Sequence, residues 1–134
     1  FTNDMDQQNA QMEQTLVMAT ATRGIDYATA MSAVGDDPEL LAELASLFLE
    51  SAPEYLAQIR AAVAGGNGRA LESAAHSLKG SVGNLGAQSA FEAAFLLERC
   101  GRNGDFSEAA RALPQLEAAM QLVNADLTAL VAGN

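Results

Sequence analysis

Apolar residues recur every three or four positions over most of this chain, which is the spacing of one face of an α-helix. Residues 1–24 carry only a weak stripe of this kind, closed by Gly24. From Ile25 onward the stripe is strong and is interrupted by short glycine-containing segments. The pattern therefore predicts a polar N-terminal segment, either a linker or an extra helix, and a helical domain over residues 25–134.

The first part of this domain is expected to hold a short helix and then a long one. The short element covers residues 25–34 and is stopped by a glycine. The long helix has Pro38 in its first turn, where proline is tolerated, with Asp36 or Asp37 as its cap. Pro53 should bend it, because proline removes an internal hydrogen bond. Its expected apolar stripe contains Leu40, Leu41, Leu44, Leu47, Phe48, Tyr55, Ile59 and Val63.

Three further helices follow after Gly-rich turns. They are expected over residues 69–85, over residues 88–100 and from Asp105 toward the C-terminus, with a kink or a fresh first turn at Pro114. The inward residues of the second of these are expected to be Phe91, Ala94, Phe95 and Leu97. The last helix carries a coiled-coil-like seam of Leu113, Leu116, Met120, Val123, Leu127 and Leu130.

Composition supports an all-α fold. The chain has 28 Ala and 17 Leu against 8 Val plus Ile, the reverse of what strands prefer. With four main amphipathic helices and short turns, we expect an antiparallel up-down four-helix bundle with one or two additional short N-terminal helices.

Charge and cysteine content exclude several classes of protein. A formal net charge of −10 argues against unaided binding to nucleic acid or to anionic lipid, because both need a cationic surface. One Cys and one His cannot form a disulfide or a structural zinc site, so Cys100 is expected to fill the core. No apolar run approaches the roughly 20 residues that span a bilayer. We expect a cytoplasmic location, and the start at Phe1 suggests a piece of a longer protein.

The candidate chemistry lies on one face of the predicted helix 69–85. At about 100° per residue, His76 falls nearly opposite the apolar arc and shares its face with Lys79, Gly80 and Gly83. His76 and Lys79 are the only His and the only Lys in the chain. A plain surface role does not explain the two glycines, each of which costs roughly 0.8–1 kcal/mol relative to Ala inside a helix.

Glycines suit a face that another backbone or a bulky anion must approach closely. Neutral imidazole is a good nucleophile at neutral pH, and an ammonium group one turn away neutralises the oxygens of a phosphoryl group in transfer. The sequence has no Walker-type phosphate loop, so use of ATP is not expected. Glu72 shares the His76 face and is expected to pair with Arg69 or Lys79.

The run Ala75-His76-Ser77-Leu78-Lys79-Gly80, followed by Asn84-Leu85-Gly86, resembles the signature of histidine-containing phosphotransfer (HPt) domains of bacterial phosphorelays. The resemblance covers about residues 25–132 and implies a carrier that is not an enzyme in its own right. It implies that His76 accepts phosphate at Nε2, that Lys79 holds the phosphoryl oxygens, and that Gly80, and more weakly Gly83, give steric access.

The resemblance also implies the partners. Receiver domains of response regulators would dock over His76 and bring magnesium, and the carrier would need no cofactor and work as a monomer. Apolar residues from 25–34 and 40–48 would form the docking platform. The C-terminal domain of a hybrid sensor kinase, itself membrane-anchored or not, is the favoured context, with a free-standing carrier as the alternative.

Two other functions stay open at the level of sequence. One is a helical adaptor that binds receivers without transferring phosphate. The other is a helical interaction or dimerisation module built on the seam over residues 113–130. The seam is flanked mostly by Ala, Gln and Asn, whereas coiled-coil pairing favours charged flanks, so an intramolecular core is the better interpretation.

Overall fold

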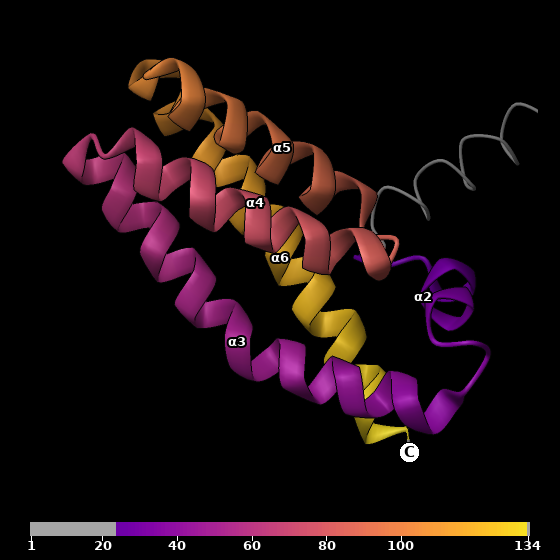
Figure 1. Ribbon diagram of the computed structural model, residues 1–134. Coiled ribbons are helices and arrows are strands. Elements are labelled where there is room, and N and C mark those ends of the chain that lie inside the picture. The colour runs from indigo at the N-terminus through magenta and orange to yellow at the C-terminus, as the bar shows by residue number, and fades with distance from the viewer. Residues whose placement is uncertain (1–23, 134) are drawn as a thin grey trace, which may run out of the picture.

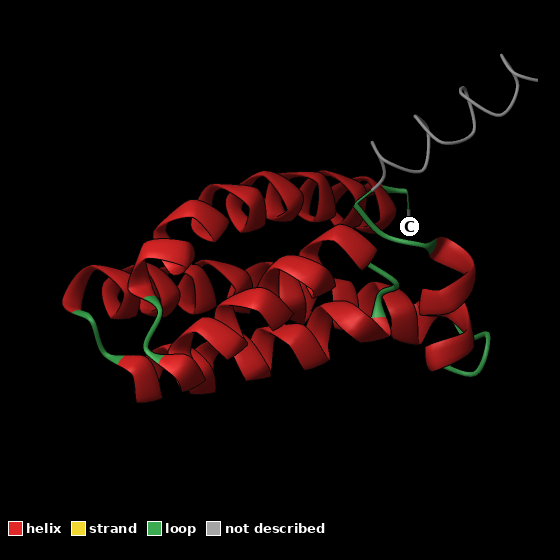
Figure 2. Ribbon diagram, turned by 90° about the horizontal axis from the view of Figure 1, so that it is seen from above, coloured by secondary structure: helices red, strands yellow, loops and turns green. Residues whose placement is uncertain are grey.

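The computed structural model describes residues 24–133, which form helices joined by short turns (Figures 1 and 2). The helices are α2 (Tyr27–Ala33), α3 (Pro38–Gly65), α4 (Gly68–Asn84), α5 (Gln88–Asn103) and α6 (Phe106–Ala132). No strand occurs within this range, and the all-α prediction is confirmed. The predicted N-terminal stripe lies outside the described residues.

Helices α3 to α6 form an antiparallel bundle in which each helix packs against the next and α6 returns to α3 (Figure 1). Short α2 lies across one end of the bundle, against α3 and α4. The core is one continuous cluster, whose largest fully buried side chains are Leu41, Ile59, Leu71, Leu78, Leu97, Leu116, Met120, Leu127, Val82 and Val123. Among residues 24–133, no helix is long and apolar enough to cross a membrane.

Side-chain caps set most helix starts. Asp37, not Asp36, caps α3 by accepting hydrogen bonds from the amides of Glu39 and Leu40. Asp105 caps α6, as predicted, so this helix begins at Phe106. Of the two alternatives expected at Pro114, a kink or a fresh first turn, the fresh first turn is wrong, because α6 is already established two turns earlier and continues through Pro114.

Part of the predicted α3 stripe lies on the surface, and one prediction about the core is wrong. Leu40, Leu44 and Leu47, which belong to the segment 40–48 expected to form a docking platform, are exposed at 39%, 43% and 54%. The buried face of α3 lies beside these three leucines and contains Leu41, Ala45, Phe48, Ala52, Leu56, Ile59 and Ala62. Phe95 is also exposed, whereas the sequence pattern placed it inward.

The end of α4 is tied to the start of the described chain. The amide of Asp26 donates to the carbonyl of Leu85, and Gly86 turns the chain with a φ of 65°. A Cβ on Gly86 would lie 2.7 Å from the Cβ of Asp26, so glycine is required both by backbone conformation and by space. These contacts hold α2 beside the C-terminal end of α4.

Candidate functional site

His76 lies on the outer face of α4, and its side chain is 67% exposed. The opposite face of the helix is buried through Leu71, Ala75, Leu78 and Val82. The exposed position predicted for His76 is confirmed.

Glu98 on α5 is the site residue that the sequence interpretation missed. It is 4% exposed, and it is the one buried charged residue between positions 24 and 133. Its Oε1 lies 3.0 Å from His76 Nδ1 and 3.4 Å from Arg102 Nη2, and its Oε2 lies 2.7 Å from Lys79 Nζ. Oε2 receives no hydrogen bond of regular geometry, so the Lys79 contact is best described as an ion pair. One carboxylate therefore gathers three basic side chains.

A signal for Glu98 was present in the sequence. It follows Ala94 by four positions, and Ala94 belongs to the predicted inward face of the helix. A carboxylate on an apolar face needs a partner, because burying an unpaired charge is costly. The partner was not evident, because it comes from another helix.

Two glycines explain why α4 and α5 approach so closely here. A Cβ on Gly101 would lie 2.6 Å from the amide nitrogen of Glu72, and a Cβ on Gly68 would lie 2.6 Å from the carbonyl oxygen of Gly101. No residue with a side chain fits such a crossing without moving a backbone. Because Glu72 lies one turn before His76 and Gly101 lies nearly one turn after Glu98, the crossing brings the carboxylate beside the imidazole.

The site keeps Glu98 ionised. Burial acts to raise the pKa of this carboxyl group, but the contacts from Lys79 and His76 outweigh burial and lower the pKa below its ordinary value of 4.5. A carboxylate can only accept hydrogen bonds. Glu98 therefore serves as an anionic acceptor at neutral pH.

This acceptor fixes the tautomer of the imidazole. Because Glu98 Oε1 only accepts, His76 Nδ1 must carry the proton in their 3.0 Å contact. In the neutral ring, Nε2 then holds the free lone pair. An exposed imidazole with its lone pair on the far nitrogen is arranged to act as a nucleophile.

Lys79 is more enclosed than its place on the helical wheel predicted. Its side chain is 19% exposed and is bound to Glu98. The prediction for Glu72 is also wrong, because its carboxylate lies 3.6 Å from Arg102 Nε, not beside Arg69 or Lys79. Both residues differ from the prediction for the same reason, which is that α5 contributes Glu98 and Arg102 to this face.

The two glycines of the His76 face differ in their surroundings. A Cβ on Gly80 would meet no described atom within 4 Å, so this position opens onto solvent one turn from His76. A Cβ on Gly83 would lie 3.4 Å from Cδ2 of Phe91. Gly83 therefore gives room to the Phe91 ring, a contact that the sequence interpretation did not foresee.

The comparisons with known proteins agree with this arrangement. The family model for the Hpt domain matches residues 43–126, which is well over half of the chain and includes α4 and α5. The chain belongs to the Hpt domain family. Its general role is thus that of a phosphotransfer carrier in phosphorelay signalling, in a family that acts with receiver domains and has no kinase activity of its own.

A solved structure resembles this Hpt domain in fold. It is the crystal structure of histidine-containing phosphotransfer protein B (HptB) from Pseudomonas aeruginosa PAO1, with a TM-score of 0.76 and 24% sequence identity. The match covers 82% of this chain and 96% of that chain. No curated protein sequence matches the chain.

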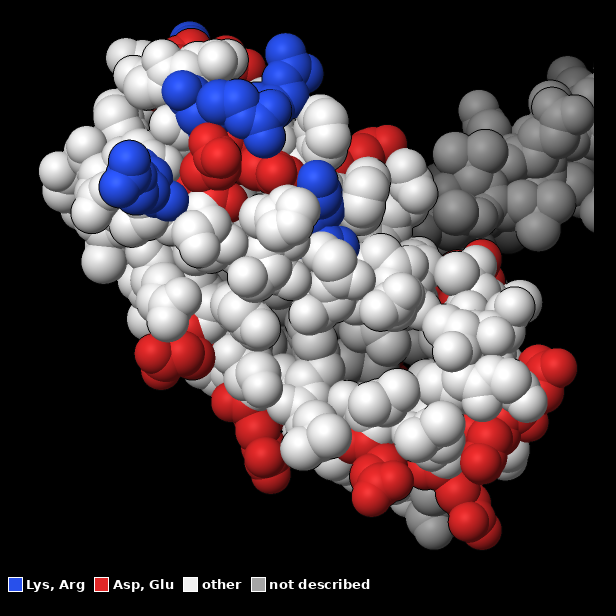
Figure 3. Space-filling view, in the orientation of Figure 1, with Lys and Arg blue, Asp and Glu red and all other residues white. Residues whose placement is uncertain are grey.

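The surface of the Hpt domain around the site is divided by charge and polarity. Lys and Arg side chains gather over α4 and α5 around a group of acidic side chains, and further Asp and Glu side chains follow the margin along α3 (Figure 3). Beside the C-terminal half of α4 runs a mostly apolar groove of about 240 Å³ lined by Leu44, Leu47, Phe48, Ser51, Tyr55, Ser81, Asn84 and Leu85. Leu44 and Leu47, from the segment 40–48 expected to form a docking platform, therefore line an exposed groove beside Ser81 of α4.

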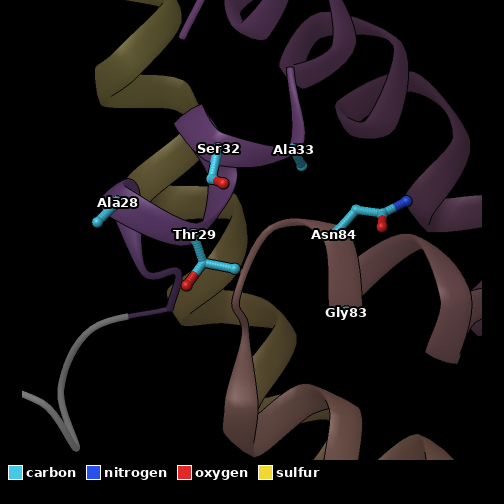
Figure 4. Close-up of a pocket in the computed structure, with 6 residues that line it drawn as sticks. All are labelled: Ala28, Thr29, Ser32, Ala33, Gly83 and Asn84. Carbon is cyan, nitrogen blue, oxygen red and sulfur yellow. The ribbon is translucent and has the colours of Figure 1, made fainter. Parts of the chain in front are cut away.

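Other features of the Hpt domain offer less chemistry. A shallow hollow between α2 and the end of α4 is lined by Thr29, Ser32 and Asn84 with small residues, and it contains no ionisable group (Figure 4). Cys100 is buried, as predicted, and burial with the nearby Glu108 and Asp105 raises the pKa of its thiol. No group of three His, Cys, Asp or Glu side chains within residues 24–133 is placed to hold a metal ion.

Proposed function

We propose that His76 is the phosphoacceptor of this Hpt domain. It receives a phosphoryl group from the aspartyl phosphate of one receiver domain and passes it to the aspartate of another. The observation that carries this proposal is the contact between His76 Nδ1 and the buried Glu98, because in the neutral imidazole it places the free lone pair on Nε2 of an exposed ring.

The transfer needs only this nitrogen from the carrier. The Nε2 lone pair attacks phosphorus in line, the bond between phosphorus and the aspartyl oxygen breaks, and its electron pair returns to the aspartate carboxylate. The receiver domain supplies the magnesium that neutralises charge on the phosphoryl oxygens. Return of the phosphoryl group to a second receiver is the same step in reverse.

Glu98 supports this step electrostatically. When Nε2 forms a bond to phosphorus while Nδ1 keeps its proton, the imidazole ring becomes cationic. The anionic Glu98, already in place and 4% exposed, offsets that charge without reorganisation. The buried carboxylate therefore favours both the reactive tautomer and the phosphorylated ring.

Lys79 and Gly80 complete the proposed site. In the free domain the Lys79 ammonium is bound to Glu98, and during transfer it contacts the phosphoryl oxygens beside it. Gly80 leaves open surface on which the receiver can approach the imidazole. The groove containing Leu44 and Leu47 provides apolar surface for the same partner.

The acceptor is tested by His76→Gln. This variant should keep the fold, because the side chain faces solvent, and should take up no phosphate from a receiver charged with acetyl phosphate. The label on the wild type should be acid-labile and base-stable, as phosphohistidine is. The control is Gln121→Asn, an exposed position on α6 outside the groove, which should be labelled like the wild type.

Two results would contradict the proposal. Acid-labile, base-stable labelling that survives His76→Gln would exclude His76, since the chain has no other histidine. A wild-type domain that binds the charged receiver but never acquires the label would instead be a non-transferring adaptor.

A further inference from the structure

Phe95 is a large aromatic side chain left on the surface beside the site. The residue is 42% exposed and lies one turn before Glu98 on α5. Lys79 Nζ lies 5.0 Å from the centroid of its ring. The ammonium therefore has two neighbours, the carboxylate of Glu98 and the face of Phe95.

The position of this ring is itself supported. Phe91, one turn earlier, stacks on Phe95 with 6.4 Å between ring centroids and an interplanar angle of 24°. Phe91 in turn packs against Gly83 of α4. A continuous chain of contacts thus runs from a glycine on the His76 face, through two aromatic rings, to the only lysine.

We propose that Phe95 is a positioning residue for Lys79: its ring holds the ammonium beside His76 when the ion pair with Glu98 opens during phosphoryl transfer. The inference rests on the role proposed above for Lys79.

The need for a second holder follows from the geometry of the imidazole. Glu98 contacts Nδ1, whereas the phosphoryl group is proposed to join Nε2 on the other side of the ring. An ammonium bound to Glu98 must therefore exchange partners to contact the phosphoryl oxygens. An aromatic face attracts a cation without forming a directional bond, so the ammonium can move across it and remain close to the site.

Arg99 provides a control for this reasoning. Its Cζ lies 6.0 Å from the same ring centroid, farther away than Lys79 Nζ. If Phe95 acted by holding any nearby cation, Arg99→Gln would affect transfer as strongly as a change at Phe95. If Phe95 positions Lys79 specifically, Arg99→Gln should leave the rate of phosphoryl transfer at saturating receiver unchanged.

The experiment compares Phe95→Leu, which keeps apolar area but removes the aromatic face, with Phe95→Tyr, which keeps that face. Transfer from a charged receiver is measured in single turnover over a range of receiver concentrations, so that the rate at saturation is separated from receiver affinity. In parallel, selective ¹³C-lysine labelling gives an NMR signal from Lys79 alone, because no other lysine exists.

Phe95→Leu should shift the Lys79 side-chain proton signals toward those of a solvated lysine, because the ring current is lost. The saturated rate should fall about 3- to 10-fold, as for the loss of one cation–π contact, while receiver affinity changes less than about twofold. Phe95→Tyr should keep both the shifted signals and the rate.

The inference is overturned if Phe95→Leu leaves the Lys79 signals and the saturated rate unchanged. It is also overturned if Phe95→Leu weakens receiver affinity alone, since Phe95 would then be a docking contact. Lys79→Gln tests the proposed role of Lys79 separately. If this variant transfers phosphate at the wild-type rate, Lys79 has no role in transfer, whether or not the NMR signals show Lys79 beside the Phe95 ring.

Discussion

At the scale of single residues, the site depends on a carboxylate that never touches phosphate. Glu98 holds the proton on His76 Nδ1, pairs with Lys79 and contacts Arg102. Buried charges of this kind are costly when a partner is removed, because the remaining charge is left without compensation. The same contacts therefore connect the stability of the domain to the reactivity of its histidine.

The lowered pKa of Glu98 predicts a dependence of stability on pH. A carboxyl group that is more acidic in the folded state stabilises the fold above its ordinary pKa of 4.5, and this contribution is lost as the pH falls through the lowered value. Thermal unfolding of the wild type and of Glu98→Gln, measured between pH 7 and pH 3, should show the wild type more stable near neutral pH. The difference in stability between the two proteins should narrow steadily below about pH 4.5.

The comparison isolates Glu98, because the substitution leaves every other carboxyl group of the chain in place. Glu72→Gln serves as the control, since this more exposed residue contacts the same Arg102. If the difference in stability between wild type and Glu98→Gln stays constant from pH 7 to pH 3, the contacts of Glu98 with its partners do not lower its pKa in the folded state.

At the scale of elements, α4 and α5 form the site together, and their glycines have different tasks. Gly68 and Gly101 permit the close crossing of the two helices, Gly83 gives room to Phe91, and Gly80 faces open space. Each glycine inside a helix lowers stability relative to Ala. Only the glycine on the open surface lacks a reason within the folded domain itself.

Gly80→Ala and Gly83→Ala form a matched pair that tests this difference. Both should stabilise α4 by up to about 1 kcal/mol, with a smaller gain at Gly83, where the new Cβ meets the Phe91 ring. Gly80→Ala should slow transfer and weaken receiver binding, because its methyl group lies on the approach surface, whereas Gly83→Ala should leave receiver binding unchanged, because its methyl group faces the Phe91 ring. Melting curves and single-turnover rates measure both effects, and equal rates for Gly80→Ala and wild type would refute the role in access.

At the scale of the whole molecule, what could be predicted from sequence was set by distance along the chain. His76, Lys79 and Gly80 lie within about one turn of one helix, so a helical wheel placed them on one face. The buried Glu98 partner could not be placed in this way, because it depends on the rotation of α5 against α4, which the Gly68–Gly101 crossing sets.

The same limit applies to the apolar stripes of α3 and α5. Leu44 and Leu47 fit an apolar stripe, but the contacts of α3 with its neighbours select the adjacent face, which is rich in alanine. Phe95 likewise fits the apolar pattern of α5 but stands beside Lys79 on the surface. An apolar pattern predicts a helix and its amphipathic character, and the packing partners decide which apolar side chains remain outside for another molecule.

The most direct test of the central claim is ¹⁵N NMR of the single histidine, before and after phosphorylation by a charged receiver. We predict that the resting protein shows the proton on Nδ1 and a free lone pair on Nε2, and that phosphorylation produces coupling to phosphorus at Nε2. Phosphorus coupled to Nδ1, or a resting ring with its proton on Nε2, would contradict the proposal that Glu98 prepares His76 for transfer.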